Sequence, residues 1–161
     1  MDTISHHITF DSPLGFIKIA ASETGISGLS FVDEMSPDFN GNSLLVLCRR
    51  QLLEYFSHSR TEFDLPLDLH GTEFQKRTWE ELRRIPCGKT ISYLELAKKL
   101  GNALLIRAAG GANSRNPLAI IVPCHRVIGS DGSLTGFSGG LDRKKWLLEF
   151  EAKYVQSELF S

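Results

Sequence analysis

The apolar run at residues 120–122 and the cysteine that follows it constrain this chain more than any other stretch. Residues 120–122 are consecutive apolar residues and predict a buried strand, which Pro123 ends because proline has no N–H to donate to a ladder. Cys124 therefore stands where regular structure stops and a site can open. An isolated cysteine near an apolar run is commonly a small core residue. Here His125 and Arg126 follow at once and a glycine-rich segment comes after them, which favours a reactive thiol.

The three cysteines, Cys48, Cys87 and Cys124, lie far apart and form no Cys-x-x-Cys pair. This spacing argues against a disulfide framework and against a zinc site, so we expect no bound metal and reduced thiols. Cys48 falls on the apolar stripe of a predicted helix, and Cys87 lies in a turn with no histidine nearby. We interpret Cys48 as structural and Cys87 as structural or incidental, which leaves Cys124 as the reactive candidate.

The length of 161 residues allows one domain or two small ones with a hydrophobic core. With 42% hydrophobic and 23% charged residues, the composition is that of a soluble globular protein. No apolar run approaches the ~20 residues of a membrane span, so we expect no membrane partner. The N-terminus lacks the regions of a signal peptide. We therefore expect a cytoplasmic protein, and a monomer.

Charge is distributed unevenly, although the net charge is only −1. Residues 1–70 carry four basic and ten acidic side chains, whereas residues 71–126 carry ten basic and four acidic ones. A basic segment beside an acidic one is typical of a face that binds a polyanion. Lysine and arginine are also common on helices as solvated charge, so charge alone leaves both interpretations open.

The first 70 residues predict a small sheet with one helix and suggest no chemistry. Apolar segments at 8–10, 16–20 and 28–32, separated by turn residues, predict an antiparallel meander. Helical spacing of apolar residues predicts a helix over 43–56. Alternation over 63–67 predicts a further strand, in which a proline favours a sheet edge.

A second, mostly helical unit is predicted over 71–161. Two pairs match the capping box that opens a helix, Thr72 with Gln75 and Ser92 with Glu95. The second of these helices closes at Gly101, and another follows over 103–113, which is a helix-turn-helix pattern whose second member is presented to DNA. A last helix is predicted over 142–154. The expected class is thus α/β (α+β), with a mainly antiparallel N-terminal domain over 1–70.

The helix over 103–113 contains an unusual run of small residues, Arg107-Ala108-Ala109-Gly110-Gly111-Ala112. Two glycines inside a helix cost about 1 kcal/mol each relative to alanine. One explanation is tight packing against a neighbouring helix. The other is close approach to a phosphate backbone, with Arg107 as the one long side chain. Both explanations can hold, on opposite faces of the helix.

Taken together, these segments resemble the O6-alkylguanine-DNA alkyltransferases, also called methylated-DNA–protein-cysteine methyltransferases. The resemblance covers about residues 72–152, and its segments occur in the family's order and spacing. They are Ile91-Ser92-Tyr93, Arg107-Ala108-Ala109-Gly110-Gly111-Ala112, Asn116-Pro117, Pro123-Cys124-His125-Arg126-Val127, Ser138-Gly139-Gly140-Leu141, Trp146-Leu147-Leu148 and Glu151. Ile85-Pro86-Cys87-Gly88 is similar to the bacterial branch.

The resemblance implies a catalytic set of four residues. Cys124 would accept the alkyl group, and His125 would act as its base through a water. Glu151 would orient and charge-balance His125, and Asn116 would hold the turn that carries the site. Alkyl transfer requires such a relay because the nucleophile is the thiolate, and a thiol of pKa ~8.5 is mostly protonated at neutral pH.

The resemblance also implies residues that bind DNA and the extruded base. Tyr93 would crowd the phosphate and contact the flipped base, and Arg107 would fill the gap left in the stack. Val127 and Ser138 would read the base through backbone groups. The other expected contacts are Ala108, Gly110, Gly111, Arg115 and Arg126.

The implied activity is a single-turnover transfer of the alkyl group from O6-methylguanine in duplex DNA to Cys124, without a cofactor. O4-methylthymine is a second candidate substrate. The base must leave the helix first, because its alkyl oxygen is unreachable inside the duplex. The partner is therefore double-stranded DNA that contains alkylated bases.

Three alternatives explain parts of the sequence. A cysteine hydrolase needs a direct contact between His and Cys, which is awkward for neighbours on an extended chain. Alkyltransferase-like proteins that only mark a lesion lack the acceptor cysteine, whereas Cys124 is present. A helix-turn-helix regulator leaves Glu151 and the Pro-Cys-His-Arg run unexplained. One departure from the family pattern is Phe137, at a position often held by Tyr.

Overall fold

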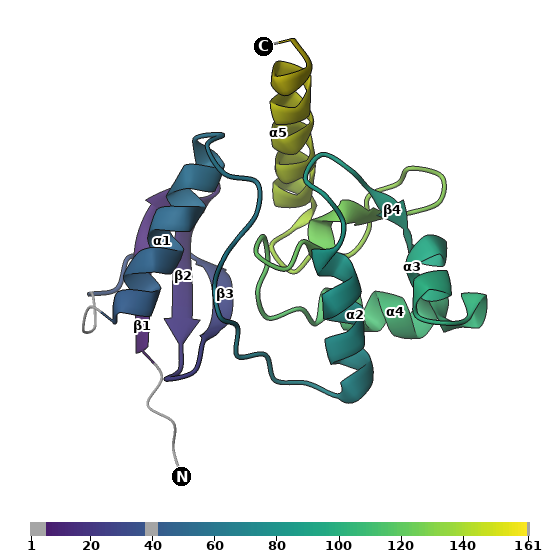
Figure 1. Cartoon of the computed structure of the whole chain (residues 1–161), viewed down its shortest axis with the longest axis horizontal. Helices are drawn as coiled ribbons and strands as arrows, with labels where there is room; N and C mark the ends of the chain where they lie inside the picture. Colours follow the sequence, from purple (N-terminus) through teal and green to yellow (C-terminus); the bar gives the residue numbers. More distant parts are fainter. Residues whose placement is uncertain (1–5, 38–41, 161) are drawn as a thin grey trace. The chain divides into compact units, whose positions relative to one another are not determined.

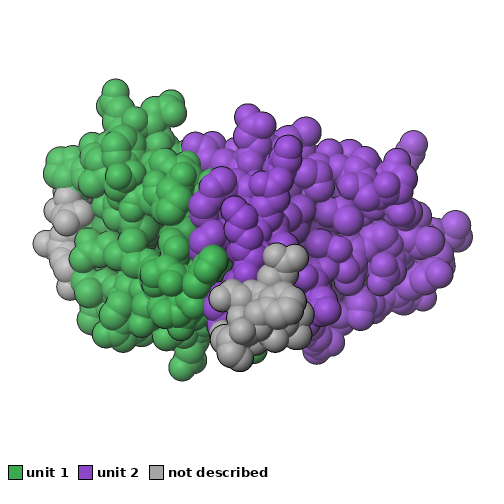
Figure 2. Space-filling view, turned by 90° about the horizontal axis from the view of Figure 1, so that it is seen from above, with its two compact units in different colours: residues 1–70 green, residues 71–161 purple. Residues whose placement is uncertain are grey.

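The computed structural model describes residues 6–37 and 42–160. The chain forms two compact units, Met1–His70 and Gly71–Ser161, which Figure 2 shows in separate colours. The first unit contains a sheet and one helix, and the second contains the remaining helices (Figure 1). This arrangement confirms the predicted mixed α/β class.

A three-stranded antiparallel sheet forms the first unit together with one helix (Figure 1). Its strands are β1 (His6–Ser12), β2 (Gly15–Ala21) and β3 (Ile26–Val32), paired in the order β1-β2-β3. The predicted meander is therefore confirmed. Helix α1 (Ser43–Phe56) packs against β1 and β2, because its apolar stripe and the alternating apolar residues of the strands bury each other.

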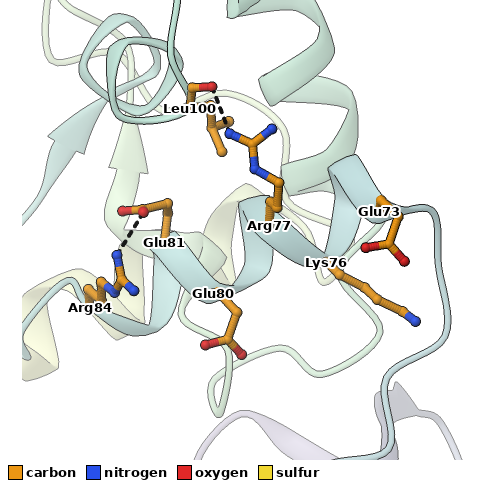
Figure 3. Close-up of a pocket in the computed structure, with 7 residues that line it drawn as sticks. All are labelled: Glu73, Lys76, Arg77, Glu80, Glu81, Arg84 and Leu100. Atoms are coloured by element: carbon orange, nitrogen blue, oxygen red, sulfur yellow. Dashed lines mark hydrogen bonds and ion pairs between the residues drawn. The ribbon is translucent and has the colours of Figure 1, made fainter.

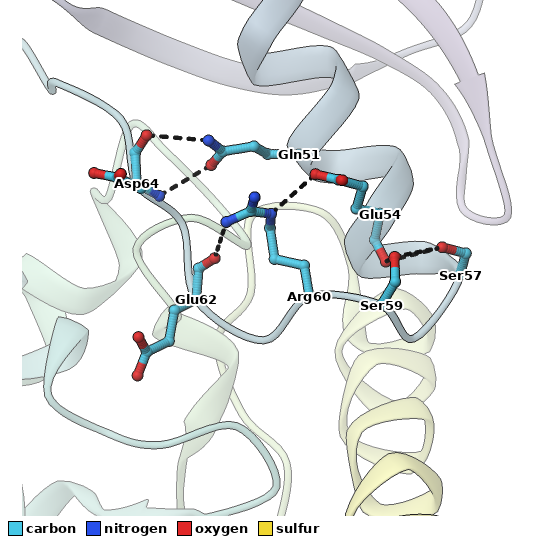
Figure 4. A network of polar contacts seen from close by, with 7 residues as sticks. All are labelled: Gln51, Glu54, Ser57, Ser59, Arg60, Glu62 and Asp64. Carbon is cyan, nitrogen blue, oxygen red and sulfur yellow. Dashed lines mark hydrogen bonds and ion pairs between the residues drawn. The ribbon is translucent and has the colours of Figure 1, made fainter.

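The strand predicted over 63–67 is wrong, and the side chain of Gln51 explains why. Gln51 Nε2 donates to the carbonyl of Asp64 (3.1 Å), and the Asp64 N–H donates to Gln51 Oε1 (3.0 Å), as Figure 4 shows. An amide side chain thus satisfies both backbone groups that a neighbouring strand would have paired. Only Leu67 forms a bridge, parallel to Ile26. Arg60 ties the same loop to α1 through Glu54 at 3.1 Å.

Helices dominate the second unit, and local capping signals place the first two. These are α2 (Glu73–Arg83) and α3 (Tyr93–Lys99), and in both the predicted capping box is formed in full. Gly101, which follows α3, has a φ of 119°, a conformation that favours glycine. A 3₁₀ turn, η1 (Ala103–Leu105), leads into α4 (Ile106–Ser114).

The small residues of α4 serve packing on one side of the helix. Ala109 and Ala112 are buried, and the indole N–H of Trp79 on α2 donates to the carbonyl of Ala112 at 2.9 Å. A larger side chain here would push α4 away from α2. A Cβ on Gly110 would make ordinary contact with the ring of Tyr93, and one on Gly111 would meet nothing within 4 Å. Packing therefore explains the alanines and leaves Gly111 unexplained.

The end of the chain differs most from the prediction. Residues 120–122 form a buried turn rather than a strand, and Cys124 begins a 3₁₀ turn, η2 (Cys124–Arg126). Strand β5 (Val127–Ile128) follows and pairs in parallel with β4 (Ile91–Ser92). Helix α5 (Leu141–Phe160) extends beyond the predicted 142–154. Within the described part of the chain, no helix is both long and apolar enough to cross a membrane.

Candidate active site

The turn that presents Cys124 is held by the side chain of Asn116. Asn116 Oδ1 accepts from the N–H of Leu118 (2.9 Å), and Asn116 Nδ2 donates to the carbonyl of Val122 (2.7 Å). Between these two points, Ile120 has a φ of 74°, which is rare for a β-branched residue. Such strain persists only where the surroundings fix it. Asn116 therefore maintains the unusual path of the chain just before the thiol.

Cys124 is a buried thiol, with 4% of its surface exposed. Its carbonyl accepts a hydrogen bond from Asn113 Nδ2 at 3.4 Å, so α4 and the thiol-bearing turn are joined directly. Burial raises the pKa of the Cys124 thiol, while the Asn116 amide and the charge of Lys144 act in the opposite direction. The resting group is thus a thiol and needs a base before it can act as a nucleophile.

His125 and Glu151 form a buried pair next to that thiol. His125 Nε2 and Glu151 Oε2 are 2.9 Å apart, and both side chains are at most 1% exposed. An ionised carboxylate can only accept, so Nε2 carries the ring proton of the neutral imidazole and Nδ1 carries the lone pair. Nδ1 is buried and has no hydrogen-bond partner among the described residues. It is the nitrogen that can receive a proton.

Protonation of this pair follows from its burial and its charges. Burial lowers the pKa of His125 despite the nearby carboxylate, and the positive charges of Arg126 and Lys144 lower it further. Burial opposes ionisation of Glu151, but its attraction to His125 and the hydrogen bonds from Arg126 and His125 prevail, and the pKa of Glu151 is lowered. Near neutral pH, His125 is therefore a neutral base beside a carboxylate whose charge Arg126 balances.

Arg126, which was expected to contact DNA, lies inside the protein and bonds to other groups of the site. Arg126 is only 5% exposed and is held inside the protein by hydrogen bonds. Its Nε and Nη2 donate to the two oxygens of Glu151, each at 2.8 Å, and Nη1 donates to the carbonyl of Ile85 at 2.6 Å. A guanidinium used in this way has no exposed edge to offer a phosphate.

Lys144 of α5 is a buried residue that the sequence analysis missed. Its Nζ donates to the carbonyls of Val127 and Thr135, each at 2.7 Å, and lies 5.8 Å from the centre of the Tyr93 ring. The Tyr93 hydroxyl donates to the same Thr135 carbonyl at 3.0 Å. Spacing could have revealed Lys144, because Lys144, Leu147 and Glu151 recur at helical intervals on one buried face.

Four of the residues expected to contact DNA lie together on the exposed face of α4 and its C-cap, namely Arg107, Ala108, Gly111 and Arg115. The side chains of the two arginines make no hydrogen bond or ion pair with another described residue. Leu104, in the turn before α4, is 88% exposed and lies next to this face in the chain. The face is thus free to meet an external partner, in contrast to the buried groups around Cys124.

Val127 and Ser138 differ in how accessible they are. The N–H of Val127 donates to the carbonyl of Cys124, and its own carbonyl accepts from Lys144. A bound base can therefore use only the second lone pair of that carbonyl. Ser138 is exposed in the loop before α5. Phe137, next to it, is half-buried, and its carbonyl accepts from the N–H of Gly140 at 2.9 Å.

A shallow hollow of about 270 Å³ lies elsewhere on the second unit (Figure 3). It is lined mostly by charged residues of α2, and in the close-up Arg77 points to the carbonyl of Leu100 while Arg84 pairs with Glu81. None of its lining residues belongs to the cluster around Cys124. The described residues also contain no group of three His, Cys, Asp or Glu side chains placed to hold a metal ion.

The surroundings of Cys124 separate it from the other two cysteines. Burial raises the pKa of Cys48 to about 12, and burial together with the charge of Glu151 raises that of Cys87 to about 11. Neither has the Asn116 amide and the Lys144 charge that favour a thiolate at Cys124. A thiol with a histidine–carboxylate pair next to it defines a protein of the cysteine-dependent group-transfer class.

Comparison with known proteins identifies the family. The DNA-binding domain of 6-O-methylguanine DNA methyltransferase matches residues 73–153, and the ribonuclease-like domain matches residues 6–69. A methylated-DNA–protein-cysteine methyltransferase of Mycobacterium leprae is 46% identical over 159 residues, 96% of each chain. The chain belongs to the 6-O-methylguanine DNA methyltransferase family, which confirms the resemblance seen in the sequence.

Solved structures agree with this assignment. The O6-methylguanine methyltransferase of Mycobacterium tuberculosis matches with a TM-score of 0.86 and 41% identity, covering 98% of this chain and 100% of that one. A structure of the Mycobacterium tuberculosis OGT in complex with DNA has a TM-score of 0.85 and 44% identity, covering 92% and 94% of the two chains.

Proposed function

We propose that this protein repairs alkylated DNA by direct reversal, moving the alkyl group of O6-methylguanine onto Cys124 in a single turnover without a cofactor. The observation that carries the proposal is the buried Cys124 thiol beside His125, whose Nδ1 is the one ring nitrogen left to accept a proton. The M. leprae relative, named as a methylated-DNA–protein-cysteine methyltransferase, supports the same activity.

The transfer step balances with these residues alone. The Cys124 proton passes to His125 Nδ1 through a water, and the resulting thiolate attacks the alkyl carbon. The new S–C bond forms as the C–O6 bond breaks, and the electron pair of that bond stays on the guanine oxygen. The proton taken from Cys124 returns to the guanine. The thioether has no ready leaving group, so each molecule of protein acts once.

Reaction inside a duplex also requires that the base be extruded, at a cost of a few kcal/mol. We assign that task to the exposed face of α4, with Arg107 entering the space that the base vacates. An inserted side chain offsets part of the unstacking cost. Tyr93, Val127 and Ser138 then border the space for the extruded base, and Asn116 holds the turn behind the thiol.

We place this activity in the cytoplasm, where three free cysteines remain reduced, and in a monomer. O4-methylthymine is the second substrate to test, because it presents an alkyl group on the same kind of exocyclic oxygen.

The proposal is tested by intact mass after incubation with duplex DNA that contains O6-methylguanine. We expect the mass to rise by one methyl group, and peptide mapping to place that group on Cys124. Cys124→Ser should abolish the change, whereas Cys48→Ser and Cys87→Ser, each checked for folding, should retain it. Methylation of Cys48 or Cys87 in the wild-type protein, or repeated turnover, contradicts the proposal.

A further inference from the structure

The arginine that follows His125 is a buried part of the site whose function the transfer reaction leaves unassigned. Arg126 Nε and Nη2 grip both oxygens of Glu151 at 2.8 Å, and Nη1 is anchored on the Ile85 carbonyl at 2.6 Å. This is the two-pronged geometry in which arginine binds a carboxylate most strongly. Arg126 therefore fixes the orientation of the Glu151 carboxylate through both of its oxygens.

One oxygen of Glu151 has two donors. Oε2 accepts from Arg126 Nη2 at 2.8 Å and from His125 Nε2 at 2.9 Å. A buried histidine bound to a lone carboxylate would be driven toward its protonated form, because the two opposite charges attract each other strongly away from water. A protonated His125 has no lone pair and cannot take the proton of Cys124. Arginine stays charged at every pH of interest, so its charge balances Glu151 permanently.

We propose that Arg126 is a positioning residue of the transfer reaction, which balances and orients Glu151 so that His125 remains a neutral base with Nδ1 as its accepting nitrogen. The proposal rests on the proposed function for its role in catalysis, while its electrostatic part concerns the free protein. It also explains why an arginine within the reactive tetrapeptide is turned away from solvent. Arg126 acts through Glu151 and touches no reacting atom.

Among the described residues, the charged and titratable groups that act on His125 agree with this balance. On α5, Glu151 bonds to Nε2 and Lys144 contributes a buried positive charge; on η2 itself, Cys124 and Arg126 are the chain neighbours of His125. From the turn after α2, Cys87 lies near Arg126 and Glu151 and stays protonated, since burial raises its pKa to about 11. His125 thus has one carboxylate and two cations acting on it. Burial is the largest cause that lowers the pKa of His125, and both cations lower it further.

The alternative is that Arg126 only ties the turn at Ile85 to α5. Under that alternative, loss of Arg126 lowers the free energy of unfolding. It also reduces the active fraction of the protein by a factor that does not depend on pH. Under our proposal, loss of Arg126 leaves the charge of Glu151 without a balancing cation from Arg126. The pKa of His125 then rises. The two accounts differ in a titration midpoint, which a purely structural role does not move.

The test is an NMR titration of the imidazole signals in the full chain without DNA, for wild type, Arg126→Gln and Arg126→Lys. We expect the pKa of His125 to rise by about one unit or more in Arg126→Gln, a tenfold change in its protonation equilibrium. Arg126→Lys keeps the charge and should stay close to wild type. The other histidines are internal references that should not shift.

Single-turnover rates give a second, independent readout. The rate should rise with pH as His125 loses its proton, and the midpoint of that rise should move up in Arg126→Gln by the same amount as the pKa. A folded Arg126→Gln protein with an unshifted His125 and an unshifted rate profile overturns the proposal. Failure of the wild-type protein to accept a methyl group would instead overturn the proposed function, and the NMR result is independent of it.

Arg126→Gln leaves a buried carboxylate without its partner and can fail to fold. In that case the double variant Arg126→Gln with Glu151→Gln, in which neither member of the pair is left charged and alone, is compared with Glu151→Gln alone. We expect the pKa of His125 to be higher in the double variant, because the positive charge of the arginine is gone. Equal values in the two proteins contradict the proposal.

Discussion

The turn around Cys124 and the exposed face of α4 belong to the same unit but hold their side chains in opposite ways. His125, Arg126 and Glu151 are at most 5% exposed, and each is fixed by hydrogen bonds inside the protein. Arg107 and Arg115 are exposed, and their side chains bond to no other described residue. The first region is therefore arranged before a substrate arrives, whereas the second is free to adapt to one. Substitutions in the first region should therefore lower the rate of alkyl transfer, and substitutions in the second should change the interaction with DNA.

The largest expected effect is that of Glu151→Gln on the transfer rate. The amide cannot charge-balance His125 as it takes up a proton, so single-turnover transfer should slow about 100-fold, within the usual contribution of a positioned base. Affinity for duplex DNA should stay nearly unchanged, because Glu151 is buried. Glu149→Gln, an exposed neighbour on α5, is the matched control and should behave as wild type.

The same substitution leaves Arg126 without its carboxylate, so the free energy of unfolding should also fall, by about 3 kcal/mol. Rates are therefore measured well below the midpoint of thermal unfolding. If Glu151→Gln transfers at the wild-type rate, Glu151 has no part in the mechanism.

A smaller effect is expected on the salt dependence of DNA binding. The logarithm of the binding constant should fall linearly with the logarithm of salt concentration, by about 0.9 per phosphate neutralised. Arg115→Ala should reduce this slope by about one phosphate. Arg60→Ala, which removes an arginine paired with Glu54 in the first unit, should leave the slope unchanged. Strong preference for one undamaged sequence would favour a regulator over a repair protein.

Gly111→Ala should give the smallest effect, with opposite signs for stability and binding. The position is exposed inside α4, and a Cβ meets nothing within 4 Å, so alanine should stabilise the helix by up to about 1 kcal/mol. If the glycine serves close approach of DNA, affinity should fall several-fold in the same protein. Thermal unfolding and duplex titration measure the two effects. A more stable variant with unchanged affinity shows that the glycine does not serve DNA binding.

Features set by short-range chemistry were predicted well from the sequence. Both capping boxes formed as expected, because Thr72 with Gln75 and Ser92 with Glu95 satisfy the free N–H groups of a helix start within three residues. The meander of the first unit followed from its alternating apolar segments and turn residues. The family was recognisable for a similar reason, since its segments are long and keep their spacing.

Features set by distant side chains were not predictable. Residues 120–122 were expected to form a strand, but Asn116 holds them as a turn. The segment 63–67 was expected to pair as a strand, but Gln51 satisfies the backbone of Asp64 within it instead. The burial of Arg126 depends on Glu151, which is 25 residues away. In each case one polar side chain determined the outcome, and apolar periodicity does not report such a contact.

The most direct test of the division between the two regions compares free base and duplex as substrates for Arg107→Ala. If Arg107 fills the vacated stack, the variant should repair O6-methylguanine in duplex DNA about tenfold more slowly or worse, but react with a free alkylguanine base almost as wild type. Arg107→Lys should recover little, because an ammonium cannot stack between bases, and Cys124→Ser should lose both reactions. Equal slowing on both substrates, or full activity of Arg107→Lys, would contradict the assignment of base extrusion to α4 and of transfer to the buried cluster.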